Sequence, residues 1–201
     1  MIGFIIAGGR SSRMGGTHKC LLELNGVTIL ERIKTRTQDQ LSELVLNAND
    51  AEPELKATGL PVISDILPGY LGPLAGLHAC MDFARHKTPS DTWIATFASD
   101  APFVPCDLVA KLMEAVSNDV DAVVANSAGQ THPLSGLWRL DCVDQLKNIM
   151  MNDEIRAMRH WIGQIRTAEV SFSESPFDPF FNINDRQDLL EGERLAKAYN
   201  L

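Results

Sequence analysis

Short apolar runs alternate with longer amphipathic stretches along most of the chain, and this alternation restricts the fold more than any other feature. Runs of a few apolar residues are typical of buried strands, whereas apolar residues at helical spacing indicate helices. Strands that alternate with helices favour a parallel sheet covered on both faces. We therefore expect a three-layer α/β fold that forms a single domain over residues 1–201.

The expected elements follow directly from this pattern. The expected strands are the short apolar runs at Ile2–Ile6, Leu44–Leu46, Pro61–Ile63, Trp93–Ala98, Ala122–Ala125 and Pro133–Leu140. The expected helices are the longer stretches at Thr28–Gln40, Pro73–Arg85, Leu108–Val116, Cys142–Met150, Glu154–Trp161 and Asp185–Tyr199. The stretch Ser171–Pro179, which holds Ser, Pro, Phe and acidic residues, is expected to be a loop.

The chain is acidic, with a net charge of -8 and a pI of about 5.1. An acidic protein has little non-specific attraction to nucleic acid or anionic lipid. We expect no signal peptide, because the apolar run at the start is too short and lacks a basic flank, and no apolar run approaches the roughly 20 residues of a membrane span. The closest cysteines, Cys80 and Cys106, are too far apart for a CxxC motif, so we interpret the four cysteines as reduced core thiols. We expect a cytoplasmic protein that binds neither nucleic acid nor a membrane.

A glycine-rich, basic segment follows the first expected strand directly, at residues 7–19. It holds four glycines, two arginines, one lysine and two serines. Ligands of open α/β sheets bind beyond the carboxyl ends of strands, and glycines let backbone N–H groups approach phosphate oxygens. In an acidic chain, this cluster of positive charge indicates a small phosphorylated ligand. The segment matches neither a Walker A motif nor GxGxxG, which disfavours a simple ATPase and a dinucleotide oxidoreductase.

The run IAGGRSSRMGGTHKCLLELNG resembles the signature of the molybdenum cofactor guanylyltransferases, usually written LAGGxSxRMGxxDKxLL. The order of elements also fits this family over nearly the whole chain. The resemblance implies a mostly parallel, Rossmann-like nucleotidyltransferase sheet, with this segment wrapped around the triphosphate of an NTP. The positions that it assigns to the base, ribose and phosphates are Ile6, Ala7, Gly8, Gly9, Arg13 and Lys19.

One position departs from the family signature, which has Asp where this chain has His18. The simplest interpretation of His18 is a free surface histidine. If the family Asp only orients the lysine, His18 can substitute for it, and if the Asp does more, activity is reduced. The departure leaves a non-catalytic nucleotide-binding protein as an alternative, although the intact Lys19 and Asp100 favour an enzyme.

The apolar run Trp93–Ala98 is followed by Asp100 and a proline turn. A carboxylate beyond the end of a buried strand lies at the ligand edge of the sheet. Mg²⁺ prefers carboxylate and phosphate oxygens. The segment resembles the metal-binding element of the family, which implies Asp100 as the Mg²⁺ ligand. A helix-capping or turn residue is the alternative.

Asn47 and Asp65 also come just after expected strands, within VLNAN and VISD. The family places a nucleotide-contacting Asn and Asp at these points. An amide and a carboxylate can read the donors and acceptors of guanine. Turn residues are the alternative interpretation for both positions.

The expected acceptor site depends on the resemblance alone. The stretch at residues 69–76 resembles the GPLAG element of the family, and residues 181–185 resemble its FxNxN element. Helix initiation and an Asx-turn are the respective alternatives. The residues implied to bind the pterin are Gly16, Gly72, Gly76, Asn182 and Asn184.

The expected reaction is transfer of GMP from GTP to the terminal phosphate of molybdopterin, with release of pyrophosphate. Arg13, Lys19 and Asp100 are the expected catalytic residues, and Mg²⁺ is the expected cofactor. Related cytidylyltransferases and sugar-phosphate nucleotidylyltransferases tend to read A-A-G where this chain reads Ala7-Gly8-Gly9, so guanine is favoured and the sister reactions remain alternatives. The family also implies transient contacts with other cofactor-assembly proteins and with molybdoenzymes.

Overall fold

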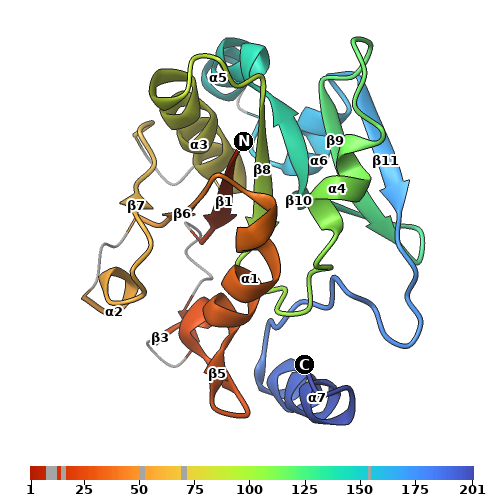
Figure 1. Cartoon of the computed structure of the whole chain (residues 1–201). Helices are drawn as coiled ribbons and strands as arrows, with labels where there is room; N and C mark the ends of the chain where they lie inside the picture. Colours follow the sequence, from red (N-terminus) through yellow and green to blue (C-terminus); the bar gives the residue numbers. More distant parts are fainter. Residues whose placement is uncertain (8–12, 15–16, 50–52, 69–71, 154) are drawn as a thin grey trace.

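A seven-stranded sheet in the order β11-β9-β10-β8-β1-β6-β7 forms the centre of the molecule (Figure 1). The computed structural model describes residues 1–7, 13–14, 17–49, 53–68, 72–153 and 155–201. Within this sheet β10 is antiparallel to both of its neighbours and the other strand pairs are parallel, which confirms the expected mostly parallel sheet. The strands are β1 (Ile2–Ile6), β6 (Glu43–Asn47), β7 (Val62–Ile63), β8 (Trp93–Ala98), β9 (Ala122–Ser127), β10 (Gln130–Arg139) and β11 (Thr167–Ser171).

Helices cover both faces of this sheet, as the alternating pattern predicts. Successive residues of β1 point to opposite faces, so Ile5 packs into one apolar cluster while Phe4 and Ile6 pack into another. The first cluster takes residues from α1, α4 and α7, and the second takes residues from α3, α5 and α6. The helices are α1 (Ile29–Thr37), α3 (Pro73–Lys87), α4 (Leu108–Met113), α5 (Val143–Asn152), α6 (Met158–Ile162) and α7 (Arg186–Ala198).

Local sequence signals set the starts of the main helices. The Thr28 side chain caps α1 by accepting a hydrogen bond from the Glu31 backbone N–H at 3.1 Å. Asp185 and Asp188 form a reciprocal capping box at the start of α7. Pro73 occupies the first turn of α3, where its missing N–H costs nothing. These helices agree with the expected ranges to within a few residues.

The expected helix over Glu154–Trp161 is wrong in its first half. α5 extends to Asn152, residues 155–157 are not helical, and α6 begins only at Met158. The Arg156 guanidinium donates to the backbone carbonyl of Met150, near the end of α5. This contact spans only six positions, but no apolar pattern reveals it, and it keeps residues 155–157 out of a helix. Glu154 lies outside the described residues.

A tight turn explains why β10 runs against its neighbours. β9 and β10 are joined by Ala128 and Gly129, with φ of 51° and 73°, the positive values that a two-residue hairpin turn requires. β10 therefore begins at Gln130, earlier than expected, and Pro133 lies where its pairing with β9 is interrupted between His132 and Gly136. A proline is tolerated there because it removes no ladder hydrogen bond.

Several small elements were not expected from the sequence. β11 is an edge strand with only alternate apolar residues, so its apolar signal is weak. The segment after β1 contains two-residue strands, which are too short for a periodic pattern. The unexpected elements between β1 and α1 are β2 (Arg13–Met14), β3 (Thr17–His18), the 3-10 turn η2 (Lys19–Leu21), β4 (Glu23–Leu24) and β5 (Val27–Thr28). The short helix α2 (Pro53–Lys56), between β6 and β7, was also not expected.

No helix in the described part of the chain combines the length and apolar content needed to cross a bilayer. All four cysteines are free thiols. Cys20, Cys80 and Cys142 are buried, as expected for core thiols, but Cys106 is exposed. The expectation of four core thiols is therefore wrong at Cys106, which lies in the loop before α4.

Candidate functional site

The carboxyl ends of β8, β1, β6 and β7 meet along one edge of the sheet. Ile6 at the end of β1 pairs with Ala98 of β8 on one side and with Asn47 of β6 on the other. Asn47 in turn pairs with Ile63 of β7. The residues at the ends of these strands and just beyond them therefore come to the same edge, where parallel sheets bind ligands. The predicted site residues placed there are Ala7, Asn47, Asp65 and Asp100.

Asn47, Asn49 and Asp65 form one hydrogen-bonded group at this edge. Asn47 Nδ2 donates to Asp65 Oδ1 at 3.1 Å, and Asn49 Nδ2 donates to Asp65 Oδ2 at 2.8 Å. Asn49 Oδ1 also accepts from the Asp65 backbone N–H at 2.9 Å. Each carboxylate oxygen thus has one amide donor and keeps further acceptor capacity. Asn49 was missed at the sequence level, although it lies in the same VLNAN stretch as Asn47.

Gly76 lies against Asn47 of this group and against Ile6 at the end of β1. A Cβ at Gly76 would lie 2.5 Å from Asn47 Oδ1 and 3.0 Å from Ile6 Cγ2. Asn47 is fully buried, and its Oδ1 accepts no hydrogen bond from the described residues. The first turn of α3 can therefore approach β1 and β6 only because residue 76 has no side chain. Gly72 precedes α3 with a φ of 73°, a conformation that favours glycine.

Lys19 and Asp100 both lie beside the C-terminal segment. Lys19 Nζ donates to Asn184 Oδ1 at 3.3 Å, a contact between residues 165 positions apart. Burial raises the pKa of the Asp100 carboxyl above its ordinary value, and attraction to the Lys19 ammonium offsets part of that shift. The predicted phosphate-binding lysine, the predicted metal ligand and one predicted pterin ligand are therefore neighbours.

Asn182 ties the same segment to Asp100. With its amide nitrogen turned toward two oxygens, Asn182 donates to Asp100 Oδ1 at 3.3 Å and to the Phe180 carbonyl at 3.2 Å. The Ile183 backbone N–H donates to the Asp100 carbonyl at 2.9 Å. The stretch 180–184 therefore docks on the loop that follows β8. Both asparagines of the FxNxN element reach the predicted catalytic pair, Asn182 through Asp100 and Asn184 through Lys19.

The glycine-rich segment is described only in part. Gly8, Gly9 and Gly16 lie outside the described residues. The backbone of Arg13 pairs with that of His18 in the β2–β3 hairpin, while the Arg13 side chain lies outside the description. The His18 side chain is only 2% exposed. The interpretation of His18 as a free surface histidine is therefore wrong, because the hairpin turns it into the interior.

A further group of polar residues lies beside the C-terminal segment. Ser127 Oγ is 2.7 Å from His132 Nε2 and donates to Asp178 Oδ1 at 2.8 Å. No local signal in the sequence links His132 to Asp178. These residues become neighbours only because the β9–β10 hairpin folds beside the loop after β11.

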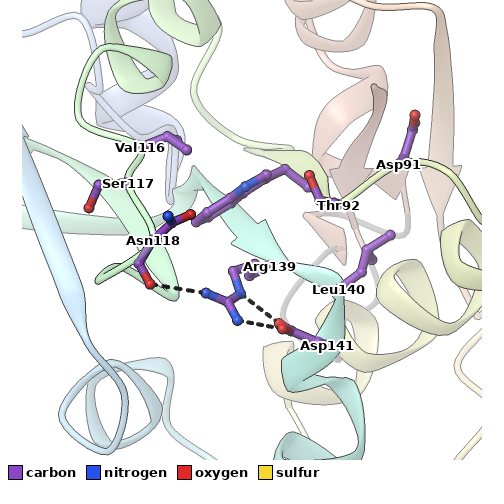
Figure 2. A pocket seen from close by; sticks show the side chains of 9 residues that line it. Asp91, Thr92, Val116, Ser117, Asn118, Arg139, Leu140 and Asp141 are labelled. Atoms are coloured by element: carbon purple, nitrogen blue, oxygen red, sulfur yellow. Dashed lines mark hydrogen bonds and ion pairs between the residues drawn. The ribbon is translucent and has the colours of Figure 1, made fainter.

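A cavity of about 500 Å³ lies at the opposite edge of the sheet, where β8 begins and β10 ends. Figure 2 shows Arg139 on its wall, held by the Asp141 carboxylate and by the Asn118 carbonyl. Arg139 Nε is 2.8 Å from Asp141 Oδ1, so the positive charge of the guanidinium is already paired. The predicted site residues follow the other end of β8. The cavity is therefore separate from the strand-end cluster.

Comparisons with known proteins converge on one family. The family model of the MobA-like NTP transferase domain matches residues 3–169. A molybdenum cofactor guanylyltransferase from Nitrobacter hamburgensis is 38% identical over 195 residues, which cover 96% of this chain and 93% of that protein. Another from Bradyrhizobium sp. is 40% identical over 195 residues, 96% of this chain and 92% of that protein.

Solved structures show the same fold at lower identity. Molybdopterin-guanine dinucleotide biosynthesis protein A from Archaeoglobus fulgidus superposes with a TM-score of 0.76 at 22% identity, covering 98% of this chain and 100% of that chain. A nucleotidyl transferase from Methanothermobacter gives a TM-score of 0.77 at 20% identity, covering 99% and 98%. The arrangement of strands and helices described above is therefore that of known nucleotidyltransferases.

Proposed function

Because the chain belongs to the molybdenum cofactor guanylyltransferases, a family with the MobA-like NTP transferase domain, we propose that it transfers GMP from GTP to the terminal phosphate of molybdopterin. The products are the guanine dinucleotide form of the cofactor and pyrophosphate. The observation that carries the proposal is the single cluster that joins Lys19, Asp100 and Asn184 beside the Asn47–Asp65 pair. Such a cluster places a lysine that can bind phosphate, a carboxylate that can bind a metal ion, and hydrogen-bonding groups that can recognise a base at one edge of the sheet.

The Asn47–Asp65 end suits a guanine base. The Watson–Crick edge of guanine presents two adjacent donors, N1–H and the 2-amino group. Each oxygen of Asp65 accepts one hydrogen bond from an asparagine amide and can accept another. The two oxygens can therefore accept from both guanine donors at once, as a carboxylate accepts two parallel hydrogen bonds from an arginine. Cytosine and adenine each present one donor there, beside an acceptor that a carboxylate repels. We assign Asn47 and Asp65 to base recognition, and Ile6 and Ala7 to the wall of the base and ribose site.

The other end suits phosphates and a divalent cation. Asp100 is the carboxylate beside Lys19, and no set of three or more His, Cys, Asp or Glu in the described chain could hold a metal unaided. Mg²⁺ fits such a position because it commonly takes one or two carboxylates and completes its shell with phosphate oxygens and water. When bound, Mg²⁺ would neutralise charge on the triphosphate. Asp100 would be its protein ligand.

The reaction needs no protein nucleophile, because the acceptor phosphate itself attacks the α-phosphorus of GTP. Phosphoryl-type transfers depend mainly on positioning and on charge neutralisation. Lys19 would hold phosphate oxygens as a point charge while Asn184 restrains its ammonium. Arg13, in the hairpin beside Lys19, would bind the leaving phosphates. Asn182 and Asn184 would contact the pterin, with Gly16, Gly72 and Gly76 lining the path between the two substrates.

The base preference can be measured by calorimetric titration of the protein with GTP, CTP, ATP and UTP in the presence of Mg²⁺. We expect GTP to bind about tenfold or more tightly than each of the others, since one unmatched donor or acceptor costs on the order of 1–3 kcal/mol. A preference for CTP would move the protein to the cytidylyl branch. Selective GTP binding without pyrophosphate release, when molybdopterin is supplied, would indicate a binding protein without turnover.

Asn49 is expected to act on base selectivity through Asp65. Replacing Asn49 by alanine removes the donor to Asp65 Oδ2 and the acceptor for the Asp65 N–H. We expect the preference for GTP over ITP, which lacks the 2-amino group, to fall about tenfold relative to the wild type. Titrations with the two nucleotides measure this ratio directly. An unchanged ratio in Asn49→Ala would remove Asn49 from base recognition.

Compartment and partners follow from the same assignment. The four free thiols agree with a reducing environment, and we propose the cytoplasm as the location. The product is a cofactor that other enzymes use, so transient contacts with cofactor-assembly proteins and with molybdoenzymes are part of the proposal.

A further inference from the structure

The group Ser127, His132 and Asp178 forms a hydrogen-bonded chain that the proposed reaction does not use. Ser127 ends β9 and is only 1% exposed. Its Oγ lies 2.7 Å from His132 Nε2 on β10 and 2.8 Å from Asp178 Oδ1 in the loop after β11. These hydrogen bonds therefore hold the segment 172–184, between β11 and α7, against the β9–β10 hairpin.

The donors and acceptors in the Ser127–His132–Asp178 group decide whether it can act as a catalytic triad. A serine hydroxyl has one proton, and here Ser127 donates it to the Asp178 carboxylate. His132 Nε2 must then be the protonated ring nitrogen that donates to Ser127 Oγ. Burial lowers the pKa of His132 below its ordinary value, an effect that attraction to Asp178 partly offsets, which agrees with a neutral ring. A histidine that donates to a serine cannot deprotonate it, so the group is not a hydrolytic triad.

The segment held by Ser127, His132 and Asp178 carries the asparagines that contact Asp100 and Lys19. Asp178 Oδ1 also accepts from the Phe180 backbone N–H at 2.9 Å, and the His132 ring stacks on Phe180 at 4.6 Å between centroids. The Phe180 carbonyl and Asp100 Oδ1 share the amide of Asn182. A continuous set of contacts thus runs from the β9–β10 hairpin to the loop that follows β8.

We propose that His132, Ser127 and Asp178 are positioning residues for the acceptor, because together they hold the segment that presents Asn182 and Asn184. The proposal rests on the guanylyltransferase function and adds residues that neither touch GTP nor lie at the Asn47–Asp65 end. It has a specific consequence. Loss of these hydrogen bonds should weaken use of the acceptor much more than GTP binding, because GTP keeps its contacts at the Asn47–Asp65 end and only the Asn184 restraint on Lys19 is loosened.

The test compares Ser127→Ala with Asp178→Asn in steady-state guanylyl transfer to molybdopterin and in calorimetric GTP binding. In Ser127→Ala we expect the KM for molybdopterin to rise about tenfold while the Kd for GTP changes by at most about threefold, because the lost buried hydrogen bond holds the segment that presents the acceptor contacts. Asp178→Asn keeps an Oδ1 acceptor for Ser127 and Phe180, so its KM should stay within about threefold of the wild type.

Thr96→Val is the matched control. It removes another buried hydroxyl, which accepts from Trp138 Nε1 at 2.8 Å. Trp138 packs in the apolar cluster with α3, whereas Phe180 and Ile183 of the C-terminal segment pack in the cluster with α1 on the other face of the sheet. This variant should lose thermal stability without a change in the KM for molybdopterin. If Ser127→Ala behaves in the same way, or weakens GTP and molybdopterin equally, the positioning role is wrong.

Hydrogen exchange separates this inference from the proposed function. Ser127→Ala should speed amide exchange in residues 177–184 and leave residues 44–47 of β6 unchanged, whether or not the protein is active. Faster exchange in the segment with no guanylyl transfer by the wild type would overturn both the proposed function and the acceptor role that rests on it. Unchanged exchange in the segment would overturn the anchoring itself, even in an active enzyme.

Discussion

Asp100→Asn is expected to lower guanylyl transfer by roughly 10³-fold, because metal-assisted charge stabilisation supplies several kcal/mol and each 1.36 kcal/mol is tenfold in rate. Asparagine keeps an oxygen that accepts from Asn182, and the backbone bond from Ile183 to residue 100 is unaffected. The local fold should therefore persist. Pyrophosphate release at saturating GTP, Mg²⁺ and molybdopterin measures the effect.

The melting temperature of Asp100→Asn distinguishes loss of the metal ligand from loss of the fold. Since burial raises the pKa of Asp100, its ionised form costs free energy in the folded protein at neutral pH. The amide removes that cost, so the melting temperature of Asp100→Asn should equal or exceed that of the wild type. Asp107→Asn changes the same charge at an exposed position paired with Lys111 and should leave turnover unchanged. Turnover near the wild-type rate in Asp100→Asn would contradict the metal-ligand assignment.

Gly76→Ala is expected to weaken GTP binding by about 10- to 100-fold, since overpacking a filled site costs roughly 1–3 kcal/mol. The added Cβ would lie 2.5 Å from Asn47 Oδ1, well inside contact distance. Asn47 is fully buried between strands and cannot swing into solvent, so its amide must shift and lose its 3.1 Å bond to Asp65. Calorimetric titration with GTP measures the loss.

Gly76→Ala should change GTP binding more than it changes the melting temperature. Alanine is favoured over glycine inside a helix by about 0.5–1 kcal/mol, which offsets part of the steric cost in the melting temperature. Nothing offsets the displacement of Asn47 in GTP binding. Gly163→Ala is the matched control, because its Cβ would meet only the His160 and Arg159 carbonyls at 3.5 and 3.6 Å, which are ordinary contacts. Unweakened GTP binding in Gly76→Ala would show that Asn47 does not hold the base.

The main elements of the fold were predictable because each has a local signal. β1 and β8 are continuous apolar runs, and α1 and α7 have side-chain caps at their starts. The start of α6 was predicted wrongly because Arg156 ties the preceding residues to α5. β11 was missed because an edge strand needs few apolar residues. The antiparallel direction of β10 depends on two residues with positive φ in a turn that no long pattern marks.

The sequence alone determined which residues follow the strand ends, and therefore that Asn47, Asp65 and Asp100 share one edge of the sheet. This was possible because all parallel strands of a sheet end on the same side. Tertiary structure alone decided the partners across long sequence distances: Asn184 for Lys19, Asn49 for Asp65, and Asp178 for Ser127. It also decided that His18 is buried. Those contacts depend on how loops pack against the finished sheet, and a loop side chain has no periodic pattern that reveals its direction.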